Sequence, residues 1–220
     1  MNFNKFIIFN FFLIIFLFFF SKSAYAHTFI GMVGFFDGIS HPVLGFDHFI
    51  AMVSVGIISA QIGGRAIWTI PTTFVFIMII GGIIGIYAEL NQISQSLKLI
   101  NIENQIFFAD FLFMIIEIGI LISVIALGLI IAIEKILSVQ LIITAVGIFG
   151  FFHGSAHGLE MPQAINPIFF ALGFAVGTSI LHIFGLIIGH YLIKTKLSTM
   201  ILRVTGIFFA CIGLYSIINL

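Results

Sequence analysis

The stretch LSVQLIITAVGIFGFFHGSAH, residues 137–157, decides what kind of fold this sequence can adopt. It carries no lysine, arginine, aspartate or glutamate, and about 20 mostly apolar residues are enough for a helix to cross the hydrocarbon core of a bilayer. Gly150 and Gly154 lie four residues apart, as do His153 and His157. Because residues four apart share one face of a helix, the stretch predicts a membrane-spanning helix with a glycine face beside a pair of imidazoles.

The whole chain has the composition of an integral membrane protein. Of its 220 residues, 61% are hydrophobic and 7% are charged, and the mean hydropathy is +1.31. The formal net charge is zero and no basic or acidic block stands out, so nucleic acid is not an expected partner. Cys211 is the single cysteine, so any metal site must use nitrogen and oxygen ligands.

Six stretches after residue 26 are long and apolar enough to span a bilayer, and they leave no room for a soluble domain. The longest link, 89–105, is polar and is expected to carry at most a short surface helix. We therefore predict an all-α polytopic integral membrane protein, with a bundle of six transmembrane helices in residues 27–220, in a bacterial inner (plasma) membrane. The predicted spans are 41–60, 67–87, 109–133, 137–157, 167–193 and 198–218.

Glycine at spacing four recurs in three of these spans and predicts how the helices pack. Helices in lipid associate through close backbone approach at small residues. The glycines concerned are Gly81 and Gly85, then Gly150, Gly154 and Gly158, then Gly173, Gly177, Gly185 and Gly189.

Residues 1–26 are predicted to be a cleaved signal peptide. Lys5 precedes an apolar stretch at 6–20, and SKSAYA ends in the small-x-small pattern that signal peptidase reads. The alternative is an uncleaved first transmembrane helix. Cleavage after Ala26 would make His27 the mature N-terminus, where its amine and imidazole could chelate a metal, or where it could be exposed without a role.

Positive charges predict the orientation of the bundle. With the mature N-terminus outside, five basic residues fall in cytoplasmic links or at their edges, whereas Lys98 alone lies outside. Acidic residues lie on the outer side and would attract cations to that entrance. The five basic residues are Arg65, Lys135, Lys194, Lys196 and Arg203, and the acidic ones are Asp37, Glu89, Glu103, Asp110 and Glu160.

Ionisable groups inside a membrane span are costly, so each one is a functional hypothesis. In the first span, Pro42 is predicted to be the first residue of a helix, with His41 at its cap. His48 lies seven residues after His41 and would share its face, while Asp47 would be displaced by about 100°.

The later spans add further polar groups. Glu160 could close a site built on His153 and His157, beyond a helix end expected at Gly158 or Pro162. Glu117 and His182 lie deeper in the third and fifth spans. Each histidine by itself could be a structural hydrogen-bond partner, but together these groups predict the ligand stations of a cation path.

From these residues we expect a transporter of a divalent first-row cation rather than an enzyme. Imidazole and carboxylate suit Ni²⁺, Co²⁺ and Zn²⁺ alike, and no phosphate-binding loop for ATP is present, so movement would be passive, ion-coupled or driven by a partner. One alternative is a membrane haem or di-metal oxidoreductase, with His48 and His153 as facing ligands. A metallohydrolase with Glu117 as base is a weaker alternative, because HExxH is absent.

Three segments resemble the HupE/UreJ family, the membrane accessory proteins associated with nickel hydrogenases and ureases: HPVLGFDHFIAMVSVG (41–56), FFHGSAHGLEMP (151–162) and ALGFAVGTSILHIFG (171–185). The resemblance implies a permease for nickel, or for cobalt, that supplies such metalloenzymes, with the metal as cargo and no permanently bound cofactor. The sequence leaves open whether the chain also binds a second copy of itself or a metallochaperone. Ser155 departs from a pattern in which many members carry a third histidine or an aromatic residue. The residues at matching motif positions are His41, Asp47, His48, His153 and His157.

Overall fold

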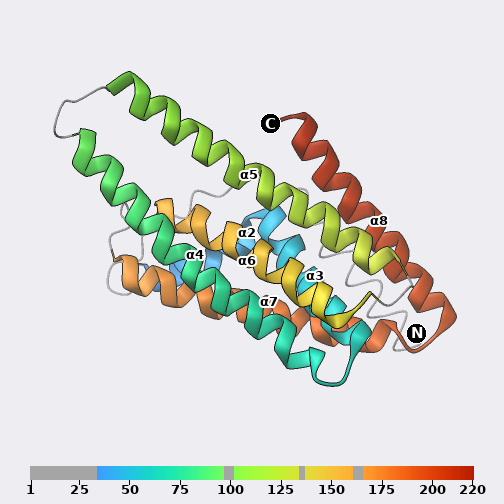
Figure 1. The fold of residues 1–220 in the computed structure, drawn as a ribbon. Helices are drawn as coiled ribbons and strands as arrows, with labels where there is room; N and C mark the ends of the chain where they lie inside the picture. Colours follow the sequence, from blue (N-terminus) through green and yellow to red (C-terminus); the bar gives the residue numbers. More distant parts are fainter. Residues whose placement is uncertain (1–33, 97–101, 134–136, 161–165) are drawn as a thin grey trace. The chain divides into compact units, whose positions relative to one another are not determined.

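The computed structural model describes residues 34–96, 102–133, 137–160 and 166–220, with the backbone alone at 92–96, 102–110 and 160. The chain divides into Met1–Gly31 and Met32–Leu220, and every described helix belongs to the second unit. The signal peptide predicted at 1–26 and His27 lie outside the described residues. The helices are α2 (Phe35–Leu44), α3 (Phe46–Ile62), α4 (Ala66–Ser96), α5 (Ile102–Ala132), α6 (Val139–Glu160), α7 (Pro167–Leu192) and α8 (Lys196–Ile218) (Figure 1).

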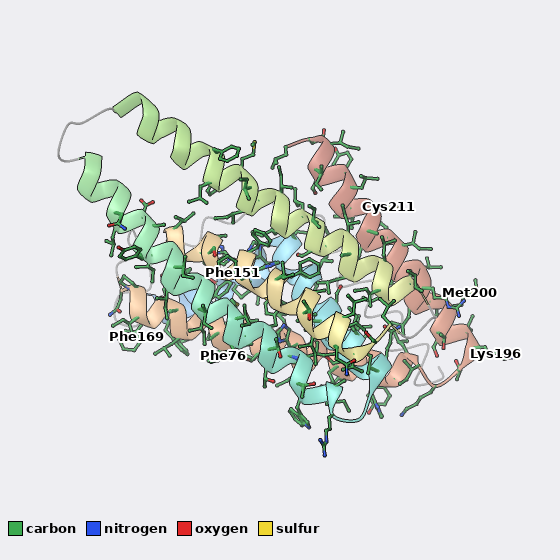
Figure 2. The ribbon with its side chains drawn as sticks, viewed as in Figure 1. Phe76, Phe151, Phe169, Lys196, Met200 and Cys211 are labelled. Carbon is green, nitrogen blue, oxygen red and sulfur yellow. The ribbon has the colours of Figure 1, made fainter. Side chains whose placement is uncertain are left out.

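These helices confirm the predicted all-α membrane bundle. The helices α4 to α8 are each long and apolar enough to cross a membrane, and α2 with α3 passes the same test as one bent span. The outer surface is apolar, as a lipid-facing surface must be. Figure 2 shows Phe76 on α4 and Phe169 on α7, whose exposed fractions are 64% and 45%.

The predicted first span, 41–60, is divided between two helices, and here the sequence prediction was wrong. Pro42 lies inside α2 rather than at the start of a helix, and His41 lies in the last turn of α2 rather than at a cap. The helix begins earlier because the Gly34 amide donates to Asp37 Oδ2 at 3.1 Å. Proline lacks an N–H and its ring opposes the carbonyl four residues back, so α2 ends two residues later and α3 departs at 83° after Gly45.

Glycine-to-backbone contacts hold the bundle together, as the spacing predicted. Between α4 and α6, a Cβ added to Gly150 would lie 2.6 Å from the carbonyl oxygen of Phe74, and one added to Gly81 would lie 3.1 Å from the amide nitrogen of Ser155. Gly158, expected to end a helix, lies inside α6 and packs on Gly82. Similar contacts join α2 and α3 to α7, and α5 to α8, at Gly38, Gly56, Gly128, Gly173, Gly177, Gly185, Gly189 and Gly206.

The bundle has two chemically different ends. The start of α3 and the end of α6 carry histidines at one end, and the described link residues at the other end include Arg65 and Lys194. Arg65 follows Gly63 and Gly64, whose φ angles of 72° and 58° turn the chain from α3 into α4. Figure 2 shows Lys196 at the opposite end of the bundle from Phe169.

The polar link 89–105 does not form a separate surface helix over its described residues. Instead, α4 continues to Ser96 and α5 begins at Ile102, whereas the apolar spans within them end at Asn91 and begin at Phe111. Both helices therefore continue beyond the membrane-spanning segments, because backbone hydrogen bonding within a helix does not depend on side-chain polarity.

The close contact at Gly154 can be tested by alanine substitution. An added Cβ would press on the carbonyl oxygen of Met78 and lie 2.9 Å from the amide nitrogen of Gly82, and these backbone atoms cannot rotate away. We expect Gly154→Ala to lower the free energy of unfolding by about 1–3 kcal/mol, measured by reversible SDS or thermal unfolding in micelles. Gly147→Ala is the matched control in α6, because its Cβ would meet no atom closer than 3.6 Å. Equal stability of the two variants would contradict this packing role.

Candidate metal-binding site

Four histidine side chains from α2, α3 and α6 meet at one end of the bundle. The ring centroid of His157 lies 4.5 Å from that of His41 and 4.6 Å from that of His48. The His48 ring lies 5.0 Å from His153 and 6.0 Å from His41. His48, His153 and His157 are at most 8% exposed. We call His41, His48, His153 and His157 the histidine cluster.

The break at Gly45 brings His41 beside His48. The sequence spacing predicted that these two residues share a face of one helix, which is wrong because they lie on different helices. A Cβ added to Gly45 would lie 3.2 Å from His48 Nδ1 and 3.3 Å from the carbonyl oxygen of His41. The glycine therefore leaves room for the His48 ring inside the bend.

Hydrogen bonds set the tautomers of two cluster histidines. His48 Nδ1 donates to Asp47 Oδ1 at 2.9 Å, which places the lone pair of the neutral ring on Nε2. His153 Nδ1 donates to the Phe149 carbonyl oxygen at 2.9 Å, and its buried Nε2 has no hydrogen-bond partner among the described residues. A carboxylate or carbonyl that accepts from Nδ1 is the usual support of a metal-binding imidazole. Asp47 therefore orients a predicted ligand in this structure.

An aromatic wall from α7 covers one side of the cluster. The Phe174 ring lies 4.3 Å from His157 and 6.1 Å from His41, and Phe170 stacks on Phe174 at 6.3 Å. Sequence reasoning missed both phenylalanines. Their spacing of four residues puts them on one face of α7, but around the helix Phe174 is turned by about 80° and Phe170 by about 120° from His182, so the sequence carried no signal for them.

The remaining predicted residues lie beside or below the cluster. Glu117 on α5 is partly buried and close enough to Asp47 and His48 for their charges to act on it. His182 on α7 is 2% exposed and contacts Phe74 rather than a cluster histidine, at a ring distance of 5.1 Å. Glu160 ends α6, and its side chain lies outside the described part of the chain.

Three of the four close ring pairs in the cluster meet edge to face, and the pair His48–His157 is tilted at 55°. The interplanar angle is 76° between His41 and His157 and 80° between His48 and His153. Among the described side chains, no three His, Cys, Asp or Glu are arranged to hold a metal ion. Coordination would therefore require the imidazole rings to rotate about their side-chain bonds.

The space beside the cluster is too small for a large organic group. The cavity that His157, Met78 and Phe174 help to line has a volume of about 90 Å³, whereas pockets for organic ligands begin at roughly 300 Å³. A bis-histidine haem needs a slot for its macrocycle, but the His48 and His153 rings are in edge contact at 5.0 Å. This geometry does not favour the haem alternative.

Comparison with known proteins agrees with the resemblance found in the sequence. The family model described as HupE / UreJ protein matches residues 15–95 and 97–216. Protein HupE of Rhizobium leguminosarum bv. viciae is 33% identical over 163 residues, which cover 74% of each of the two chains. No solved structure matches this chain. With a family match over most of its length and a relative of this identity, the chain belongs to the HupE/UreJ family.

Proposed function

We propose that this protein carries a divalent transition-metal cation, nickel or else cobalt, across the membrane into the cytoplasm. The observation that carries the proposal is the histidine cluster, four imidazoles from three helices within 6.0 Å of their nearest neighbours. Buried polar groups in a membrane are expensive, so their collection at one place indicates a shared ligand. The family resemblance to accessory proteins of nickel enzymes favours nickel among the metals that imidazole binds.

The charges near the cluster suit a divalent ion. Moving Ni²⁺ out of water is favourable only if nearby groups replace its hydration shell and balance its charge. Imidazole nitrogens supply the ligands, and the Asp47 carboxylate, which accepts from His48 Nδ1, supplies negative charge close by. Cys211 is exposed on α8 and is not part of the site (Figure 2).

The proposed direction follows from the two ends of the bundle. Arg65, Lys194 and Lys196 lie at the end away from the cluster, and basic links are typical of the cytoplasmic side. The cluster would then face the outside and meet the ion first. Donor atoms that must rotate to bind suit a carrier, because the cargo has to leave as readily as it enters.

Nickel uptake by cells that express single variants tests the proposal. His153→Ala and His157→Ala each remove a buried ring, and we expect uptake to fall at least about tenfold, the lower end of the effect of disturbing a metal site. Asp47→Ala should also reduce uptake, whereas Asp47→Asn should retain more because an amide oxygen can still accept from His48 Nδ1.

His190→Ala is the control for these variants. It removes an exposed histidine near the opposite end of α7 and should leave uptake unchanged. Membrane levels of each variant must be matched by immunoblotting. Equal nickel accumulation in wild type, His153→Ala and His157→Ala would refute the role of the cluster.

The uptake rate is expected to depend on external pH. An imidazole must be neutral to bind a metal, and its ordinary pKa is about 6.5. Protons therefore compete with Ni²⁺, so uptake should fall as the pH drops from about 7.5 to about 5.5. Radioactive nickel uptake at constant free Ni²⁺ measures this. A flat profile over that range would argue against direct coordination by histidine.

A further inference from the structure

One phenylalanine ring contacts both the histidine cluster and His182. The Phe74 centroid is 5.4 Å from that of His153 and 5.1 Å from that of His182. Phe74 is fully buried, with no exposed surface. The three side chains come from α4, α6 and α7, so this contact joins three helices.

His182 has the chemistry of a second ligand station. It is 2% exposed, and neither of its ring nitrogens has a hydrogen-bond partner within the described part of the chain. A buried polar group without a partner is uncommon in folded proteins and calls for an explanation. A cation that arrives from His153 would supply a partner, and the Phe74 ring contacts both imidazoles.

A second space beside His182 is apolar. His182 lines a groove of about 450 Å³ between α4 and α7, and its other walls include Trp68, Phe76 and Ile183, which are more than half exposed on the apolar surface of the bundle. An ion in that groove would face hydrocarbon. Phe74, in contrast, contacts both His153 and His182 inside the bundle.

The backbone that carries Phe74 is fixed in place. A Cβ added to Gly150 would lie 2.6 Å from the Phe74 carbonyl oxygen, so α4 and α6 are already in contact at this level. A large shift of α4 along α6 would disturb the glycine contacts above and below it. Opening would therefore come from rotation of the Phe74 side chain.

We infer that Phe74 is the barrier residue of the transport path, the apolar constriction that separates an outer site at the histidine cluster from an inner site at His182. This inference rests on the proposed transport of a metal cation. An apolar ring excludes water, so an ion passes only when a histidine on each side replaces its lost hydration. Phe74 then sets both the transport rate and the discrimination against Mg²⁺, which sheds water reluctantly and prefers oxygen ligands.

The test uses purified full-length protein in liposomes, with Ni²⁺ influx and equilibrium Ni²⁺ binding measured side by side. We expect Phe74→Ala to raise influx by on the order of tenfold, equal to about 1.4 kcal/mol of barrier, and to admit Mg²⁺. Nickel binding at the outer site should stay unchanged. Phe74→Leu should give a smaller increase with an intact fold, and Phe74→Trp should reduce influx.

Phe209→Ala is the matched control, since Phe209 is 1% exposed and lies on α8 outside the cluster. It should leave influx and selectivity unchanged. If the wild type transports Ni²⁺ and both Phe74→Leu and Phe74→Ala transport it at the same rate, Phe74 is not the barrier, although the proposed transport stands. An equal increase in Phe209→Ala would also overturn the barrier. Absence of both binding and influx in the wild type would remove the proposed function and the barrier with it.

Discussion

Close contact between helix backbones at glycine is the interaction on which the rest of this structure depends. Lipid is as apolar as a leucine side chain, so helices in a membrane gain little from burying leucine against each other and rely on tight packing. At Gly150 and Gly81 the absence of a side chain lets α4 and α6 touch through their backbones, and Gly206 does the same between α5 and α8. This short separation places rings from neighbouring helices within reach of one another.

The break after Pro42 adds a second constraint. An unbroken helix would have spaced His41 and His48 about two turns apart along one axis, whereas the 83° bend returns them to a ring distance of 6.0 Å. The same bend lets Asp47 sit at the start of α3 and accept from His48. One span thus supplies two imidazoles and the carboxylate that orients one of them.

Two hydrogen bonds compensate part of the polarity of the buried cluster. His48 and His153 each donate one ring proton, to Asp47 and to the Phe149 carbonyl, while Phe170 and Phe174 keep that region apolar. Such a site is stabilised most by a cation that exchanges its hydration water for imidazole nitrogens. The proposed cation cargo fits this requirement.

Local periodicity explains what could be predicted from the sequence. Apolar length predicted the membrane spans, glycine spacing predicted the packing faces, and the four-residue interval placed His153 and His157 on one side of α6, because each of these depends on a single helix. The role of Pro42 was misread, since proline favours a helix start as well as a helix end, and only the packing of α2 on α7 decides between them. The continuation of α4 and α5 past their apolar spans was also missed, because apolar length marks the membrane-spanning part of a helix and not where the helix ends.

The partners across helices were decided by the tertiary structure alone. Phe74, Phe170 and Phe174 are three of 29 phenylalanines, and nothing in their immediate neighbours distinguishes them. Their contacts with histidines come from segments that are separated by many residues along the chain. The sequence by itself determined which helices form and which faces are polar. The structure determined which faces meet, because that depends on the separation, tilt and bending of whole helices.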